Sequence, residues 1–150
     1  MREAHFEVFF GNISGIYRAI QKLRADFAEE EGVKSVHIFW IYLLHEHPEG
    51  LIASELAEMS RTARSLVSRE ISELVERNMV CARPQSERRR YAWKFFLTED
   101  GAALAKRIDE AAMRIQRDIS REIPAEDLTV FYRVLSELSG KFLGITEAKE

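Results

Sequence analysis

The hydrophobic pattern at the start of the chain predicts one long helix. Apolar side chains recur at alternating steps of three and four residues, which is the spacing of one helix face. The pattern ends before Gly32, and glycine is favoured just after a helix C-terminus. A second helix is predicted over about 35–46 and is apolar almost all round, which is typical of a helix at the centre of a core. The first stripe consists of Phe6, Phe9, Ile13, Ile16, Ile20, Leu23 and Phe27.

The next pattern predicts a short helix, a tight turn and a longer helix. The short helix spans 51–59, and Ser60-Arg61 forms the turn. Thr62 is a candidate N-cap for the longer helix, because a threonine hydroxyl can accept a hydrogen bond from a free backbone N–H at a helix start. This helix is expected to end at about Arg77, followed by Asn78, which tolerates the left-handed conformation. The side chains expected to face inward are Ile52, Leu56, Met59, Leu66, Val67, Ile71, Leu74 and Val75.

Beyond Asn78 the period of the pattern changes from helix to strand. From residue 90 to 97, large apolar side chains occupy every second position, which is strand spacing. Residues 79–83 are expected to form the partner strand. Residues 84–89 then form the tip of a hairpin, and that tip is rich in arginine.

Two further helices are predicted to follow the hairpin. Thr98 is a candidate N-cap for the first, which runs to about Glu122, and Pro124 fits the first turn of the second. The last helix carries a heptad-like apolar stripe that can pack on another helix, in this chain or in a second copy. The sequence thus predicts a mainly α (α+β) fold in the order α-α-α-α-β-β-α-α, as a single domain over 1–150. The stripe consists of Leu128, Phe131, Leu135, Leu138 and Phe142.

Composition adds an uneven distribution of charge. The chain has 150 residues and a net charge of −3, but residues 61–94 hold nine Lys/Arg against four Glu, a net charge of +5. The other residues carry −8, and this asymmetry suggests a polyanion-binding segment on an acidic body. The single cysteine, Cys81, excludes a disulfide framework and a cysteine-based zinc cluster, and it fits a reducing cytoplasm. The longest apolar run, 36–44, is too short to span a bilayer.

The predicted order of elements has the proportions of a winged helix-turn-helix. On the longer helix, the outer face of the N-terminal half carries Arg64, Ser65, Ser68 and Arg69. A DNA major groove admits such a helix, where arginine can make two hydrogen bonds to a guanine edge and small serines allow close approach. Three arginines at the hairpin tip suit contacts to phosphates or insertion into the minor groove. These tip residues are Arg88, Arg89 and Arg90.

Four segments resemble motifs of a known family of bacterial transcription factors. They read S-E-L-A-E-M at 54–59, R-S-L-V-S-R at 64–69, L-V-E-R-N-M-V at 74–80 and L-T-E-D-G at 97–101. In that order, they are similar to the E-L-A-E segment, the R-S-T-V-S-R recognition-helix core, the L-x-x-x-G-L-V closure and the L-T-x-x-G joint of the multiple antibiotic resistance regulator (MarR) family. The chain departs from the family where Ser60-Arg61 replaces an apolar residue and glycine, and where Asn78 replaces glycine. In the wing, Glu87-x-Arg89 stands as the equivalent of the usual Asp-x-Arg, in a ribbon longer by two residues.

The resemblance implies a homodimeric regulator, most simply a repressor, that binds an inverted-repeat operator and is released by a small aromatic or phenolic effector. The DNA-binding core would span about 35–100, and the dimerisation helices about 1–31 and 102–146. Carried over by position, Arg64, Ser65, Ser68 and Arg69 are expected to face bases and nearby phosphates. The full set of residues expected to contact DNA also includes Thr62, Arg88, Arg89 and Arg90. Those expected at the dimer interface are Phe6, Ile13, Leu128, Phe131, Leu135, Leu138 and Phe142.

Other interpretations stay open at this point. The aromatic residues of the first two helices suit a core and dimer interface, or an effector pocket lined by Phe9, Asn12, Tyr17, His37 and Trp40. His45 and His47 lie about 200° apart on a helix, unlike a chelating pair, so we expect no metal and no cofactor. With neither a phosphate-binding glycine loop nor a nucleophile elbow, the sequence does not favour an enzyme. The alternatives are a winged-helix module that binds an acidic protein, and a metal-responsive regulator.

Overall fold

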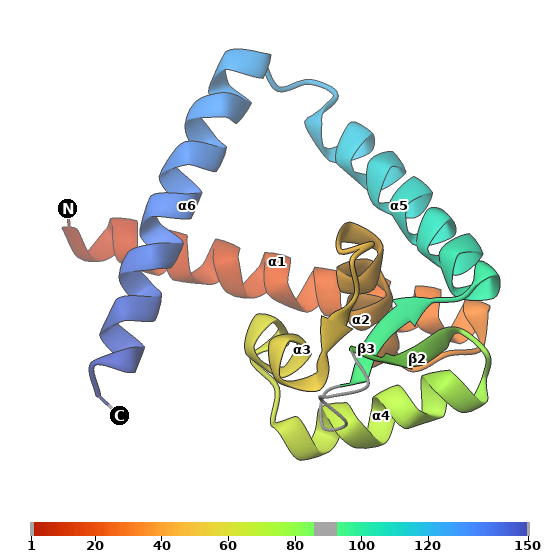
Figure 1. The fold of residues 1–150 in the computed structure, drawn as a ribbon. Coiled ribbons are helices and arrows are strands. Elements are labelled where there is room, and N and C mark those ends of the chain that lie inside the picture. The colour runs from red at the N-terminus through yellow and green to blue at the C-terminus, as the bar shows by residue number, and fades with distance from the viewer. Residues whose placement is uncertain (1, 86–92, 150) are drawn as a thin grey trace. The chain divides into compact units, whose positions relative to one another are not determined.

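The computed structural model describes residues 2–85 and 93–149. The chain divides into two compact units, Met1–Asp109 and Glu110–Glu150, and helix α5 (Glu99–Ser120) begins in the first and ends in the second. The fold is mainly helical with one small antiparallel sheet (Figure 1), as expected for a winged helix. Within the described residues, each helix is too short or too polar to cross a membrane.

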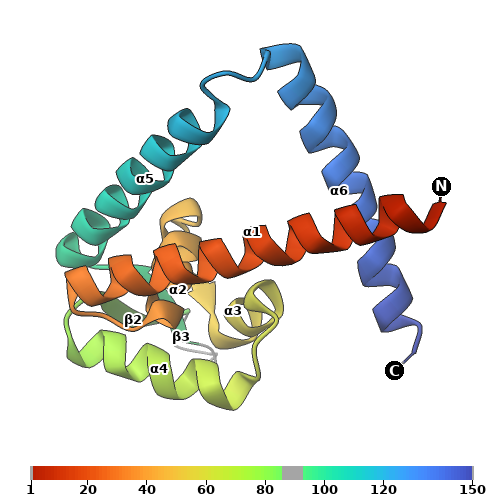
Figure 2. The ribbon, with the colours of Figure 1, turned by 180° about the vertical axis from the view of Figure 1, so that it is seen from behind.

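The two N-terminal helices follow the predicted pattern. Helix α1 (Arg2–Glu31) is followed by Gly32, whose φ of 68° is the left-handed geometry expected after a helix. Helix α2 (Ser35–Glu46) packs against α1 (Figure 2) and buries the side chains of both polar and apolar residues. These buried residues are His37, Ile38, Trp40, Ile41 and Leu44.

The helix-turn-helix starts later than predicted. Leu51–Ile52 forms a short strand, β1, and helix α3 spans Ala53–Ser60, so the expectation that the helix begins at Leu51 is wrong. The reason is long-range: β1 pairs with β3 (Trp93–Leu97), which lies more than 40 residues away. Gly50 permits this approach, because a Cβ there would lie 2.6 Å from the Phe96 ring. Of the three inward residues expected on this segment, Leu56 is buried, Ile52 is half-buried and Met59 is exposed.

The sheet has the strand order β1-β3-β2 and is antiparallel throughout. Strand β2 (Val80–Pro84) pairs with β3, with Val80 opposite Leu97 and Pro84 opposite Trp93. This confirms the predicted hairpin, with β2 shifted by one residue. Arg88, Arg89 and Arg90, predicted at its tip, lie outside the described residues.

The core of the first unit is formed by α2, the inner faces of α3 and α4 (Arg64–Glu76), the sheet and the first turns of α5. Thr98 caps α5 as predicted, since the Gly101 N–H donates to its Oγ1 at 3.1 Å. The buried apolar residues are Ala28, Ile38, Trp40, Ile41, Leu44, Leu51, Leu56, Val67, Ile71, Leu74, Val80, Leu104, Ala105 and Ile108.

The second unit consists of the end of α5 and helix α6 (Ala125–Glu147). The amide of Gln116 on α5 donates to the hydroxyl of Tyr132 on α6 at 2.6 Å. Leu128, Leu135 and Leu138 are half-buried, whereas Phe131 stays exposed. Helix α6 contains no fully buried residue.

Candidate nucleic-acid interface

The candidate interface is the outer face of α4. Arg64, Ser65, Ser68 and Arg69 are all exposed, as the helical period requires of residues opposite the buried stripe. Figure 1 shows α4 at the edge of the unit, with one side against the rest of the fold and the other open. The Arg69 side chain is 72% exposed, and its Nε lies 3.4 Å from Oε1 of Glu70.

Buried apolar side chains hold this face in place. Val67, Ile71 and Leu74 are 2% exposed or less, so α4 is anchored along its length. Of the other two residues expected inward, Leu66 is half-buried and Val75 is 38% exposed. Because burial of one such side chain stabilises by about 1.5–3 kcal/mol, the three buried residues fix the rotation of α4 about its axis.

Thr62 does not cap α4, contrary to the prediction. The N-cap position belongs to Ala63, which offers no side-chain hydrogen bond, and α4 begins at Arg64. Instead, the Thr62 hydroxyl donates to the carbonyl of Ser60 at 3.2 Å, and the residue is half-buried. The turn before it contains Arg61 with a φ of 51°, so the chain reaches Thr62 from a left-handed residue. The first backbone N–H groups of α4 therefore lack a side-chain cap, and such a helix end attracts anions.

The described part of the wing supplies two further cations, opposite each other on β2 and β3. The Arg83 guanidinium lies over the Phe96 ring, 5.1 Å from its centre, and Lys94 Nζ donates to the carbonyl of Glu49 at 3.3 Å. Both residues lie toward the end of the hairpin that leads to the arginine-rich segment. Cys81 is half-buried on β2.

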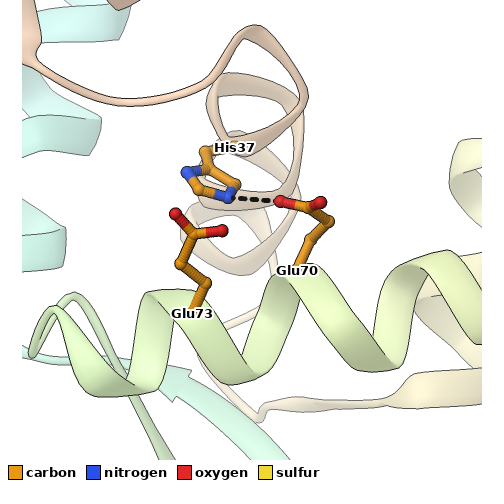
Figure 3. Close-up of side chains that lie close together, drawn as sticks. All are labelled: His37, Glu70 and Glu73. Atoms are coloured by element: carbon orange, nitrogen blue, oxygen red, sulfur yellow. Dashed lines mark hydrogen bonds and ion pairs between the residues drawn. The ribbon is translucent and has the colours of Figure 1, made fainter.

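Behind the interface, a partly buried polar cluster joins α4 to α2 and to Lys34, just before α2; Figure 3 shows three of its members. His37 Nε2 lies 3.1 Å from Oε2 of Glu70, and Lys34 Nζ lies 3.0 Å from the same oxygen and 2.6 Å from Oε2 of Glu73. Burial lowers the pKa of His37, which is wholly inaccessible, and the Lys34 ammonium lowers the pKa of Glu70. Sequence reasoning missed this cluster, because Glu70 and His37 are 33 residues apart and no local pattern links them.

The residues predicted to line an effector pocket have different surroundings. His37 and Trp40 are fully buried, with ring centres 6.4 Å apart, and Phe9 is half-buried. Asn12 and Tyr17 are exposed on α1. The pocket itself stays a prediction.

Comparisons with known proteins identify the fold. No protein-family model and no curated protein matches the sequence. Among solved structures, a MarR transcriptional regulator from Methanosarcina mazei Go1 is 21% identical, with a TM-score of 0.77 over 93% of this chain and 99% of its own. A MarR-family regulator from Listeria monocytogenes, solved with a 26mer DNA, is 17% identical, with a TM-score of 0.78 over 88% of this chain and 87% of its own.

FabT of Streptococcus pneumoniae, solved in complex with DNA, gives a TM-score of 0.81 at 12% identity, over 93% of this chain and 99% of its own. At such identities, what the chains share is the arrangement of their helices and strands. The match extends over nearly the whole length of each, including the helices outside the winged core. The chain therefore has the winged helix-turn-helix fold of the MarR-family transcriptional regulators.

Proposed function

We propose that this chain is a DNA-binding transcriptional regulator that acts as a homodimeric repressor in the cytoplasm. The observation that carries the proposal is the exposed face of α4, which presents two arginines and two serines and is anchored by three buried side chains. Two structures of the same fold contain DNA, which supports this use of the face. The chemistry that this face supports is recognition of a polyanion, which does not require catalysis.

In this mechanism α4 enters the major groove of the operator. Arg64 and Arg69 donate to base edges or phosphates, and Ser65 and Ser68 let the helix come close. The uncapped N-terminus of α4 points its free N–H groups and positive dipole end toward a phosphate. The wing, with Arg83, Lys94 and the three arginines predicted beyond the described residues, adds contacts that depend on charge rather than sequence.

A second copy of the chain would bring a second α4. In such dimers the two recognition helices lie about 34 Å apart, one turn of DNA, so the operator is expected to be an inverted repeat. Exposed apolar residues on α1 and α6, among them Phe6, Ile13 and Phe131, support an interface between copies. The full predicted set also includes Leu128, Leu135, Leu138 and Phe142.

A small aromatic or phenolic effector would release the repressor from DNA. One observation supports a ligand beside Trp40, which is predicted to line the pocket: its buried Nε1 has no hydrogen-bond partner among the described residues. Leaving such a donor unpaired costs about 1–3 kcal/mol, which an acceptor atom on a ligand would recover.

The test is binding of the purified chain to DNA from upstream of its own gene, followed by fluorescence anisotropy. We expect specific binding whose affinity falls steeply as salt is raised, because neutralised phosphates release counterions. Arg64→Ala or Arg69→Ala should weaken operator binding by about 1–3 kcal/mol where the arginine reads a base. Arg77→Ala, at the far end of the same helix, removes the same charge and should change binding little.

Two outcomes contradict the proposal. Equal weakening by Arg69→Ala and Arg77→Ala would mean that α4 contributes charge but no readout. Binding to every DNA with one affinity, or to none, would favour the alternative of a winged-helix module that uses its basic face for an acidic protein.

A further inference from the structure

We propose that His37, Glu70 and Glu73 form a binding site for a divalent transition-metal ion, with Zn²⁺ the best fit, between α2 and α4. One ligand atom from each of these residues lies within 4.8 Å of the other two (Figure 3). Two of the ligands belong to α4 and one belongs to α2, so a bound ion would fasten the two helices together. The site does not depend on the proposed function, because it rests on the geometry of these three side chains.

The distances suit a small ion with little rearrangement. In a tetrahedral zinc site with bonds of about 2.0–2.2 Å, neighbouring ligand atoms lie about 3.4 Å apart. His37 Nε2 and Glu70 Oε2 are already 3.1 Å apart. Glu70 and Glu73 are three residues apart on α4, which puts both carboxylates on one face of that helix. Small side-chain rotations are enough to close the set.

The donor set selects the class of metal. One imidazole nitrogen with two carboxylates suits Zn²⁺, whereas Mg²⁺ and Ca²⁺ prefer oxygen ligands throughout. The site is buried on the side of His37 and accessible to solvent on the side of Glu73. The His37 side chain is 0% exposed, that of Glu70 7% and that of Glu73 35%. An ion can therefore enter past Glu73, and a water can fill the fourth position.

In the structure, the Lys34 ammonium binds the two carboxylates that would hold the ion. Its Nζ lies 3.0 Å from Glu70 Oε2 and 2.6 Å from Glu73 Oε2, and its side chain is 52% exposed, so the ammonium can move into water. One ammonium leaves the carboxylate pair with a net charge of −1, which a divalent ion would neutralise. Zn²⁺ and the Lys34 ammonium are thus expected to compete for the same two carboxylates.

Coordination also requires a change in the imidazole. With Nδ1 accepting from the Lys34 backbone N–H at 3.4 Å, the ring proton sits on Nε2 and is donated to Glu70. When Nε2 binds the ion, this proton moves to Nδ1 and the hydrogen bond from Lys34 is lost. At 3.4 Å that bond is long and weak, so its loss opposes binding only slightly.

The experiment uses the full chain, stripped of metal and titrated with Zn²⁺ in competition with a chromophoric chelator. We expect one ion per chain and a higher unfolding temperature when zinc is added. Glu73→Gln should lower the affinity at least tenfold, because losing even an outer-shell partner typically costs about 10–100-fold. Lys34→Met should raise the affinity, since it removes the competing ammonium.

The two variants separate a metal site from a salt-bridge network. If the cluster served only as a salt-bridge network, Glu73→Gln and Lys34→Met would both weaken the contact between α2 and α4. The two substitutions would then not shift the zinc affinity in opposite directions. His47→Gln is the control for zinc binding elsewhere on the surface. His47 Nδ1 lies 2.9 Å from Glu49 Oε1, and this exposed pair could also attract zinc. The proposal is overturned if the wild-type chain binds no zinc, if Lys34→Met fails to raise the affinity, or if His47→Gln abolishes binding while Glu73→Gln does not.

Discussion

At the scale of single residues, Gly101 has no space for a side chain. A Cβ at this position would lie 2.0 Å from the carbonyl oxygen of Met79, and that oxygen also accepts the Thr98 N–H at 3.1 Å. The close approach lets the chain turn directly from the wing into α5. The glycine of the L-T-E-D-G segment is thus required by packing of the backbone rather than by a special dihedral angle.

We therefore expect Gly101→Ala to lower the free energy of unfolding by about 3 kcal/mol, since the methyl group must push Met79 and the wing away from α5. Urea unfolding measures the change. Gly11→Ala is the matched control: among the described residues nothing lies within 4 Å of its Cβ position on α1, and alanine should stabilise the helix by up to about 1 kcal/mol. Equal stabilities for the two variants would show that the joint is not packed as described.

At the scale of elements, the turn between α3 and α4 contains avoidable strain. Arg61 adopts φ 51°, a left-handed conformation that costs a residue with a Cβ about 1–2 kcal/mol relative to glycine. Arg61→Gly is expected to stabilise the chain by about 1 kcal/mol, after the greater freedom of glycine in the unfolded state is included. Arg61→Ala removes the same charge but keeps the Cβ, so it should not stabilise. The difference between the urea unfolding midpoints of the two variants measures the cost of the left-handed backbone conformation. If the two midpoints are equal, Arg61 is not strained.

The elements with a clear period could be predicted from the sequence, and those fixed by distant partners could not. Helices α1 and α6 follow from stripes that repeat over several turns, and α2 follows from a run that is apolar almost all round. Strand β1 has two residues and exists because β3 pairs with it, so no local pattern marks it. The predicted N-cap of α4 is wrong, because the Thr62 hydroxyl donates to the carbonyl of Ser60 and does not cap the helix.

The same division holds for the candidate site. The exposed arginines and serines of α4 follow from the helical period, because the apolar residues define the opposite side. Glu70 shares that buried side, which a charge occupies only when it is paired. Of its partners, Lys34 lies just before α2 and His37 lies on α2, and only the folded chain brings them to Glu70.

At the scale of the whole molecule, many large apolar side chains are exposed to solvent. Large apolar side chains stay open on α1, on the end of α5 and on α6, although the first unit has a complete core of its own. They include Phe6 at 60% exposed, Ile119 at 62% and Phe131 at 49%. Exposed apolar side chains that gather on one helix face often mark a surface that another molecule covers.

The last prediction is that a second copy of the chain covers this surface and that charge on α6 prevents it. Phe131→Glu should shift the chain from dimer to monomer in sedimentation velocity, because a carboxylate buried in an apolar interface loses its hydration without gaining a partner. Operator affinity should fall with it, since a monomer brings one recognition helix instead of two. Met59→Glu is the matched control, because Met59 is similarly exposed, at 43%, but lies on α3, outside the predicted interface. If the wild-type chain sediments as a monomer at every concentration, or if both variants remain dimers, α6 is not the surface that holds two copies together.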